Sequence, residues 1–225
     1  MNGLAFSLRG ALLSALPTGA LWWEDARLLC VSDLHLGKCV RPVRLGGPVL
    51  PPYETIDTLE RLDRDISLTR PETVVCLGDS FDDDAAAEEI AEETALWIAR
   101  MQAGRRWIWI EGNHDAGRGA PGGTHRAEHR EGPLVFRHIA EAGADGEVSG
   151  HYHPKASVSG RAGRVTRACF LHDDTRLILP AYGTYTGGLR WNHPAFAALL
   201  GPGAQAILTG RVPLALPLPR AASAA

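Results

Sequence analysis

The stretch TVVCLGDSFD, residues 73–82, decides the fold, because a short apolar run stops abruptly at a glycine and an aspartate. Thr73–Leu77 is continuous, apolar and bounded by turn residues, which predicts a buried strand. The same pattern recurs at Leu28–Ser32 and at Arg106–Ile110, each of which runs directly into polar residues. Three buried strands of this kind predict the centre of a layered α/β sheet.

Amphipathic helices are predicted between these strands. Leu and Ile recur at helical spacing in residues 56–66, and apolar residues form one face of residues 90–101. Acidic residues crowd the start of the second segment, where they suit the positive end of a helix dipole. The order strand–helix–strand–helix–strand therefore predicts α/β layering around a mixed sheet.

Short strands with turns between them account for most of the remaining chain. Those before residue 28 are Leu4–Leu8, Ala11–Leu16 and Ala20–Trp23. Those after residue 130 are Leu134–Arg137, Glu147–Ser149, Ala156–Ser159, Val165–Leu171, Arg176–Leu179 and Ala206–Thr209, with a short helix at Pro194–Leu200. This pattern predicts a second sheet rich in antiparallel strands. Since no repeat or linker interrupts the chain, residues 1–225 are expected to form a single domain.

Composition excludes several classes of protein. The net charge of −3 argues against a general nucleic-acid coat protein, and no apolar run approaches the ~18 residues that a membrane span needs. Four cysteines lie far apart without a C-x-x-C motif, which argues against a disulfide framework and favours a reducing cytoplasm. Lys155, Arg161, Arg164 and Arg167 form a basic stretch, for which a solvated hairpin face is favoured over contact with phosphates.

Polar side chains that commonly ligate metals follow five of the predicted strands. In layered α/β folds, sites form beyond the carboxyl ends of strands, so these side chains are expected to meet in one cleft. The D-x-H and H-x-H spacings place both members of each pair on the same side of an extended chain. The candidates are Asp33, His35, Asp79, Asn113, His138, His151 and His153.

This set of donors predicts a pair of metal ions. Carboxylate, amide and imidazole donors without thiolate suit Mn, Fe or Zn rather than Cu(I) or an iron–sulfur cluster. Seven donors are too many for one ion, but they suit two ions ~4 Å apart, with Asp79 as the natural bridge. Such a pair activates a shared water and holds both oxygens of an in-line phosphoryl displacement. His114 then remains to protonate the leaving oxygen or to stabilise developing charge.

Four motifs together resemble the signature of the calcineurin-like metallophosphoesterases. They are Asp33-Leu34-His35, Gly78-Asp79-Ser80-Phe81-Asp82, Gly112-Asn113-His114-Asp115 and Gly150-His151-Tyr152-His153. Because G-N-H-D alone is expected about 0.0008 times in a shuffled chain of this composition, chance does not explain the set. The resemblance implies a four-layer α/β/β/α sandwich, with two mixed sheets flanked by helices, and a dinuclear centre that is commonly Mn²⁺.

The same resemblance assigns roles to individual residues. Asp33, His35 and His153 would hold one metal. Asn113, His138 and His151 would hold the other, with Asp79 bridging the two. His114 would be the catalytic histidine and Asp82 its orienting partner.

Four stretches narrow the resemblance to the DNA-ligase-associated metallophosphoesterases, the group called PdeM. These stretches are Leu50–Tyr53, Gly78–Asp83, Gly132–His138 and Pro180–Leu189. This group implies a DNA endonuclease that acts in repair beside an ATP-dependent DNA ligase. The oligomeric state stays open.

Two alternatives remain at this point. Nuclease-type relatives often carry His at the position of Asp82, whereas Asp is more typical of phosphatases, so a hydrolase of nucleotides or other small phosphoesters is the second hypothesis. A metal-holding scaffold that recruits a ligase or a helicase is the third. It is disfavoured because all eight site residues, the seven ligands and His114, are intact.

Overall fold

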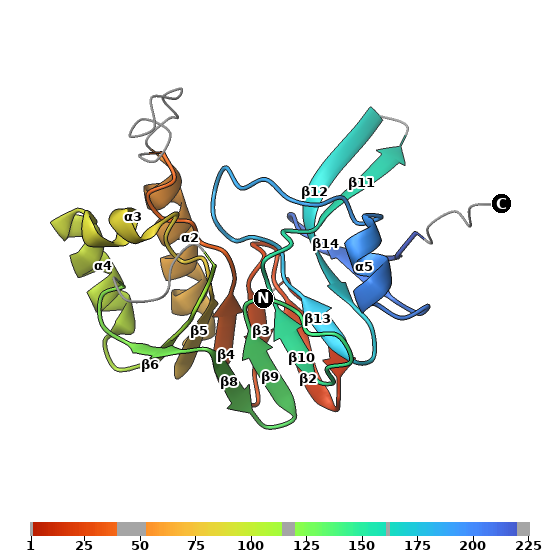
Figure 1. The fold of residues 1–225 in the computed structure, drawn as a ribbon, viewed down its shortest axis with the longest axis horizontal. Helices are drawn as coiled ribbons and strands as arrows, with labels where there is room; N and C mark the ends of the chain where they lie inside the picture. The colour runs from red at the N-terminus through yellow and green to blue at the C-terminus, as the bar shows by residue number, and fades with distance from the viewer. Residues whose placement is uncertain (1, 40–52, 114–119, 161–162, 220–225) are drawn as a thin grey trace.

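The computed structural model of the chain describes residues 2–39, 53–113, 120–160 and 163–219 (Figure 1). Its first sheet follows chain order from β1 to β7, with β1–β4 antiparallel and β4–β7 parallel. The strands are β1 (Leu4–Leu8), β2 (Ala11–Ala15), β3 (Leu21–Trp23), β4 (Leu28–Val31), β5 (Thr73–Leu77), β6 (Arg106–Ile110) and β7 (Thr124–Arg126). This is the mixed sheet that the sequence predicts.

The second sheet has the order β15-β14-β12-β13-β10-β9-β8, with β11 paired to β12. It is largely antiparallel, and β10 runs parallel to its neighbours β9 and β13. The strands are β8 (Glu128–Glu131), β9 (Leu134–Arg137), β10 (Glu147–Ser149), β11 (Lys155–Gly160), β12 (Gly163–His172), β13 (Arg176–Ile178), β14 (Gln205–Leu208) and β15 (Leu214–Pro217).

Helices cover the outer face of each sheet, as Figure 1 shows. The helices α2 (Glu54–Thr69), α3 (Asp84–Glu88) and α4 (Glu92–Gln102) lie beside the first sheet, and α5 (Pro194–Leu199) lies beside the second. The layers are therefore α/β/β/α, and the predicted four-layer sandwich is confirmed.

Alternation along the central strands builds three apolar layers. Cys30 and Val75 face the second sheet and pack against side chains such as Phe136, whereas Val31 and Val74 face α2 and α4. A third cluster lies between the second sheet and Phe196 of α5. Both faces of the central strands are thus covered, which explains why their sequences are continuously apolar.

The structure departs from the predicted elements in two places. The helix expected across residues 90–101 is preceded by a separate short helix, α3, because the side chain of Asp83 caps it by accepting from the amide of Ala86. The chain then becomes extended at Ala91 before α4 begins. Strands β7, β8 and β15 were not expected: β7 and β8 are edge strands with charged sequences that lack the apolar signal, and β15 is a short edge strand that ends in proline.

No helix within the described ranges is long and apolar enough to cross a membrane.

Candidate metal centre

The predicted ligands follow the ends of five strands, and the strand directions bring them together. Strands β4, β5 and β6 are parallel, as are β9 and β10 in the facing sheet, so each set ends at one edge. Asp33 and Asp79 each come two residues after their strand, and His138 follows β9 directly. This is the edge at which open α/β sheets place their sites.

The backbone at this edge is strained in a systematic way. Five of the seven predicted ligands have positive φ angles, which are uncommon for residues with a side chain: Asp33 (53°), His35 (47°), Asp79 (45°), His151 (70°) and His153 (47°). The expected extended geometry is therefore wrong for Asp33 and His35, although these two side chains do converge. It is also wrong for His151 and His153, which belong to different groups of side chains. Non-glycine residues held in this conformation cluster at functional sites, where the surroundings impose it.

One group of side chains consists of Asp33, His35 and His153, whose donor atoms all lie within 4.8 Å of one another. Nε2 of His153 is 3.1 Å from Oδ1 of Asp33. Both of these atoms are buried, and neither makes a hydrogen bond within the described part of the chain. The opposite oxygen, Oδ2 of Asp33, accepts from the Ser32 hydroxyl and from the His151 amide at 2.9 Å. The carboxylate is thus fixed from behind, with one oxygen aimed at the imidazole.

A second group consists of Asp79, His138 and His151, again within 4.8 Å. Nε2 of His138 lies 3.4 Å from Oδ2 of Asp79, 3.2 Å from Nδ1 of His151 and 2.9 Å from Oδ1 of Asn113. The other ring nitrogen of His138 meets the Leu77 carbonyl at 2.9 Å. That contact leaves Nε2 as the nitrogen that points into the group.

The two groups adjoin one another. Nδ1 of His138 is 3.9 Å from Oδ1 of Asp33, and the amide of His35 donates to the Asp79 carbonyl at 2.9 Å. A cavity of about 450 Å³ opens beside the second group and is lined by Asn113 and His138. The site is therefore buried on the ligand side and open on the side from which a substrate would approach.

The charges of the two groups are interdependent. Burial acts to raise the pKa of Asp33, but contacts with His153 and the charge of His138 outweigh it and hold the pKa below the usual value. Burial acts to lower the pKa of His138, but Asp79 and Asp33 raise it above the usual value. Burial lowers the pKa of His151, and the charge of His138 adds to this effect.

These residues fit a pair of divalent cations. Each group supplies one carboxylate and two imidazoles, a donor set that suits Mn, Fe or Zn. The buried Oδ1 of Asp33 and Nε2 of His153 face each other without a hydrogen bond, as two donors to one ion would. Which atoms bind which ion, and whether Asp79 bridges, remain predictions.

Asp82 lies beside the first group. Its Oδ1 is 3.3 Å from Nδ1 of His35 and 3.4 Å from Nζ of Lys38. Burial acts to raise the pKa of Asp82, but His35 and Lys38 outweigh it and lower the pKa. His114 lies outside the described residues, so its pairing with Asp82 stays a prediction.

Sequence reasoning missed two supporting residues, Ser32 and Lys38. Ser32 fixes the Asp33 carboxylate, and Lys38 meets Asp82, two contacts that no motif contains. A polar residue at the end of an otherwise apolar strand was the available signal for Ser32.

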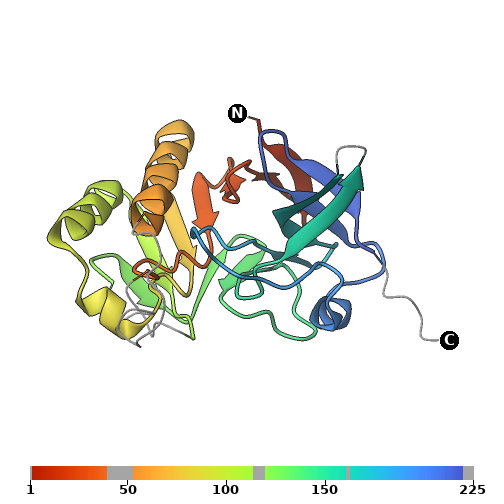
Figure 2. The same cartoon turned by 90° about the horizontal axis from the view of Figure 1, so that it is seen from above.

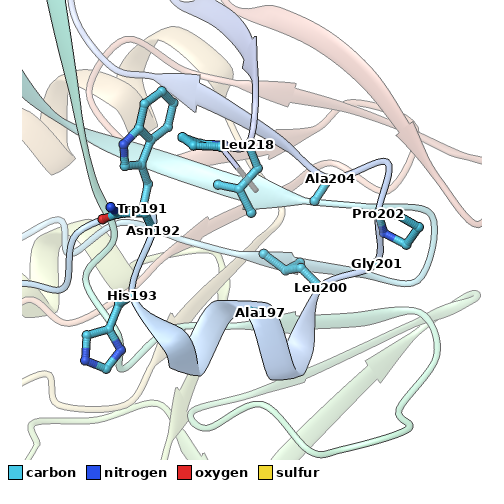
Figure 3. Close-up of a pocket in the computed structure, with 10 residues that line it drawn as sticks. Trp191, Asn192, His193, Ala197, Leu200, Gly201, Pro202, Ala204 and Leu218 are labelled. Carbon is cyan, nitrogen blue, oxygen red and sulfur yellow. The ribbon is translucent and has the colours of Figure 1, made fainter. Parts of the chain in front are cut away.

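Figure 3 shows a different cavity, of about 210 Å³, beside α5. Trp191, Leu200 and Leu218 line it, and none of the predicted site residues does. Because none of its described lining residues carries a carboxylate, it does not compete with the metal centre as the candidate site.

Comparison with known proteins agrees with this geometry. The family model described as calcineurin-like phosphoesterase matches residues 26–191. Among solved structures, the nuclease MPE of Pseudomonas putida is similar, with a TM-score of 0.75 and 29% sequence identity over 95% of this chain and 100% of that chain. None of the curated proteins matches the chain.

Proposed function

The chain belongs to the calcineurin-like phosphoesterase family, and we propose that within this family it is a DNA phosphodiesterase that cuts strands internally. It is a metal-dependent phosphoesterase. The observation that carries the proposal is the pair of adjoining groups, Asp33/His35/His153 and Asp79/His138/His151, which offer donors for two ions at one edge of the sheets.

The chain's own residues would divide the work in three. The two groups, together with Asn113, hold the cations; Ser32 and Asp82 hold Asp33 and His35 in place; and His114 donates a proton to the leaving oxygen. The chemistry that two bound divalent ions supply is activation of water and neutralisation of charge on the phosphate. Mn²⁺ is the expected metal, with Fe and Zn as alternatives.

DNA as the substrate is supported by the similarity to a protein named as a nuclease. A role in repair, beside an ATP-dependent DNA ligase, is supported by the resemblance to the ligase-associated group. A helicase partner belongs to the scaffold alternative. We also propose that residues 1–225 act as one domain, since the core between the two sheets draws on strands from both halves of the chain. The cytoplasm is the proposed location, as the four widely spaced cysteines favour.

A phosphomonoesterase is the second candidate. The observation that favours it is Asp82, a residue more typical of phosphatases at this position. Its contact with His35, at 3.3 Å, supports a positioning role beside the first group in either reaction.

The test compares a small diester with the matching monoester. The chain is stripped with EDTA, reloaded with Mn²⁺, and given bis-p-nitrophenyl phosphate or p-nitrophenyl phosphate. A preference for the diester, followed by nicking of circular DNA, is the expected result. A preference for the monoester would contradict the endonuclease proposal and support the phosphatase.

The variant His114→Ala tests the role proposed for this histidine. It is expected to bind metal with wild-type stoichiometry while diester hydrolysis falls by about 10²- to 10⁴-fold, the usual contribution of general acid catalysis. Loss of bound metal in this variant would contradict the role in proton transfer.

A further inference from the structure

A groove lies next to the metal centre and has an unusual charge for this chain. It has a volume of about 790 Å³ and lies between the loop of residues 181–186, the β11–β12 hairpin and α2. Its described lining contains four cationic residues and no acidic residue, although the whole chain carries a net charge of −3. The cations are Arg61, Lys155, Arg167 and Arg211.

The β11–β12 hairpin presents a polar face to this groove. Residues directly opposite each other on paired strands share a face, and the register pairs Lys155 with Ala168, Ser157 with Thr166 and Ser159 with Arg164. Lys155 and Thr166 line the groove, so their face turns toward it, and Arg164 extends that face along the hairpin. The opposite face contains Ala156, its register partner Arg167, and Cys169; Ala156 and Cys169 belong to the core cluster beneath α5.

Most of the groove's positive charge is uncompensated. Arg61 lies 3.3 Å from the carboxylate of Asp57. Lys155 donates to the carbonyl of Thr186 at 2.7 Å, a contact that anchors the hairpin to the loop without neutralising the charge. Arg211 is exposed and forms no ion pair with another described residue. Cations together with the hydroxyl of Thr166 are the groups that contact phosphate and sugar in nucleic-acid complexes.

An exposed aromatic side chain completes the groove. Tyr185 is 48% exposed and has a φ of 60°, so its ring stands at the surface on a strained turn. Tyr182, in the same loop, is buried and donates its hydroxyl to Asp65 at 2.9 Å, which gives it a structural role. An exposed ring beside uncompensated cations is the combination with which proteins bind unpaired bases and their phosphates.

The loop that carries Tyr185 connects the groove to the metal centre. The amides of Tyr182 and Gly183 donate to the carbonyls of Ser32 and Asp33 at 2.7 and 3.1 Å. Farther along, the amide of Leu189 donates to the Tyr152 carbonyl at 3.1 Å. Figures 1 and 2 show this segment passing between α2 and the hairpin. A strand lying in the groove would therefore continue toward the ligands.

We propose that the groove binds a single-stranded DNA segment that flanks the bond to be cleaved. Phosphates lie against Lys155, Arg164 and Arg211, and one unpaired base stacks on Tyr185. This inference rests on the proposed function, because it takes the strand in the groove to be the substrate.

The test measures binding of a fluorescent oligothymidylate to the metal-stripped full-length chain, in which no cleavage interferes. Tyr185→Ala is expected to weaken binding roughly 5- to 150-fold, the range for removal of one stacked base. Tyr185→Phe, which keeps the ring, is expected to restore it. Arg211→Ala is expected to lower the slope of log affinity against log salt by about 0.7, the value for one phosphate contact on a single strand.

Arg100→Ala is the matched control, because it removes an exposed arginine from α4, outside the groove. It is expected to leave the salt slope unchanged. Wild-type affinity in both Tyr185→Ala and Arg211→Ala would overturn the proposal. So would an equal loss of affinity for a duplex in Tyr185→Ala, since paired bases offer no free face to stack.

The outcomes separate this proposal from the proposed function. If the chain binds the oligonucleotide through Tyr185 but hydrolyses no diester when loaded with metal, the proposed function is contradicted and the groove proposal is supported. If the chain hydrolyses the diester but Tyr185→Ala and Arg211→Ala leave its affinity for the oligonucleotide unchanged, only the groove proposal is contradicted.

Discussion

Gly78 is the position at which a single added methyl group should damage the metal centre most specifically. A Cβ there would lie 2.5 Å from Nδ1 of His138 and 2.9 Å from the Cα of Gly112. Ordinary contact needs at least 3.4 Å, so the His138 ring would have to retreat by about 0.9 Å. Metal–ligand distances tolerate changes of about 0.2 Å, so Gly78→Ala should displace one ligand of the second group.

The expected loss has two parts. Because Gly78 has a φ of +69°, any L residue there destabilises the fold by about 1–2 kcal/mol. Displacement of the imidazole should lower the affinity of the second group for its metal ion by at least 10- to 100-fold, the loss typical of disturbed supporting contacts. The first group, which does not contain His138, should keep its metal.

Gly104→Ala separates these parts. Gly104 has a nearly identical φ of +73°, but a Cβ there has no heavy atom within 4 Å. Both variants should therefore lose free energy of unfolding in urea, Gly78→Ala the more because of its contacts with His138 and Gly112, and only Gly78→Ala should lose affinity when the stripped chain is titrated with Mn²⁺ by calorimetry. Two wild-type affinities in Gly78→Ala would refute the assignment of His138 as a ligand.

Two other residues give predictions with different readouts. Asp82→Asn should weaken binding of the metal in the first group about 10- to 100-fold, because the carboxylate 3.3 Å from Nδ1 of His35 no longer orients that ring. Competition with a chelator measures this affinity, and an unchanged value would leave Asp82 without a supporting role. Asp173→Ala should cost about 1.5–3 kcal/mol at pH 7, because the carboxylate accepts from the amides of Thr175 and Gly201, both at 2.7 Å. Burial acts to raise the pKa of Asp173, but these hydrogen bonds lower it, so the wild-type advantage is present above about pH 4 and shrinks as the pH falls through the folded pKa. Urea unfolding at pH 7 and pH 3 checks this, and an equal difference at both would contradict it.

The central part of the fold was predictable because its strands are buried on both faces. Thr73–Leu77 and Arg106–Ile110 are almost continuously apolar, a pattern that covered parallel strands share. The charged edge strands were not predictable in this way, although the apolar edge strand Leu4–Leu8 was. Residues 124–131 form β7 and β8 although their sequence is charged, because edge strands need only one partner and expose their side chains.

The ligand set could be predicted from the sequence because it depends on residue types at strand ends. The way in which the ligands converge could not, because it depends on left-handed backbone at five of them. Contacts across the chain were also hidden: Asp82 meets His35 and Lys38 through the folding of separate loops. The exposure of Tyr185 is likewise a property of the folded loop and carries no sequence signal.

The most direct test of the account is a count of metal ions against activity. The stripped chain is titrated with Mn²⁺, bound metal is measured per chain, and hydrolysis of bis-p-nitrophenyl phosphate is followed at each point. The account predicts two bound ions per chain, with hydrolysis appearing as both groups fill. In Asp79→Ala it predicts fewer than two bound ions and no hydrolysis. Full activity with one ion per chain, or two ions retained in Asp79→Ala, would contradict it.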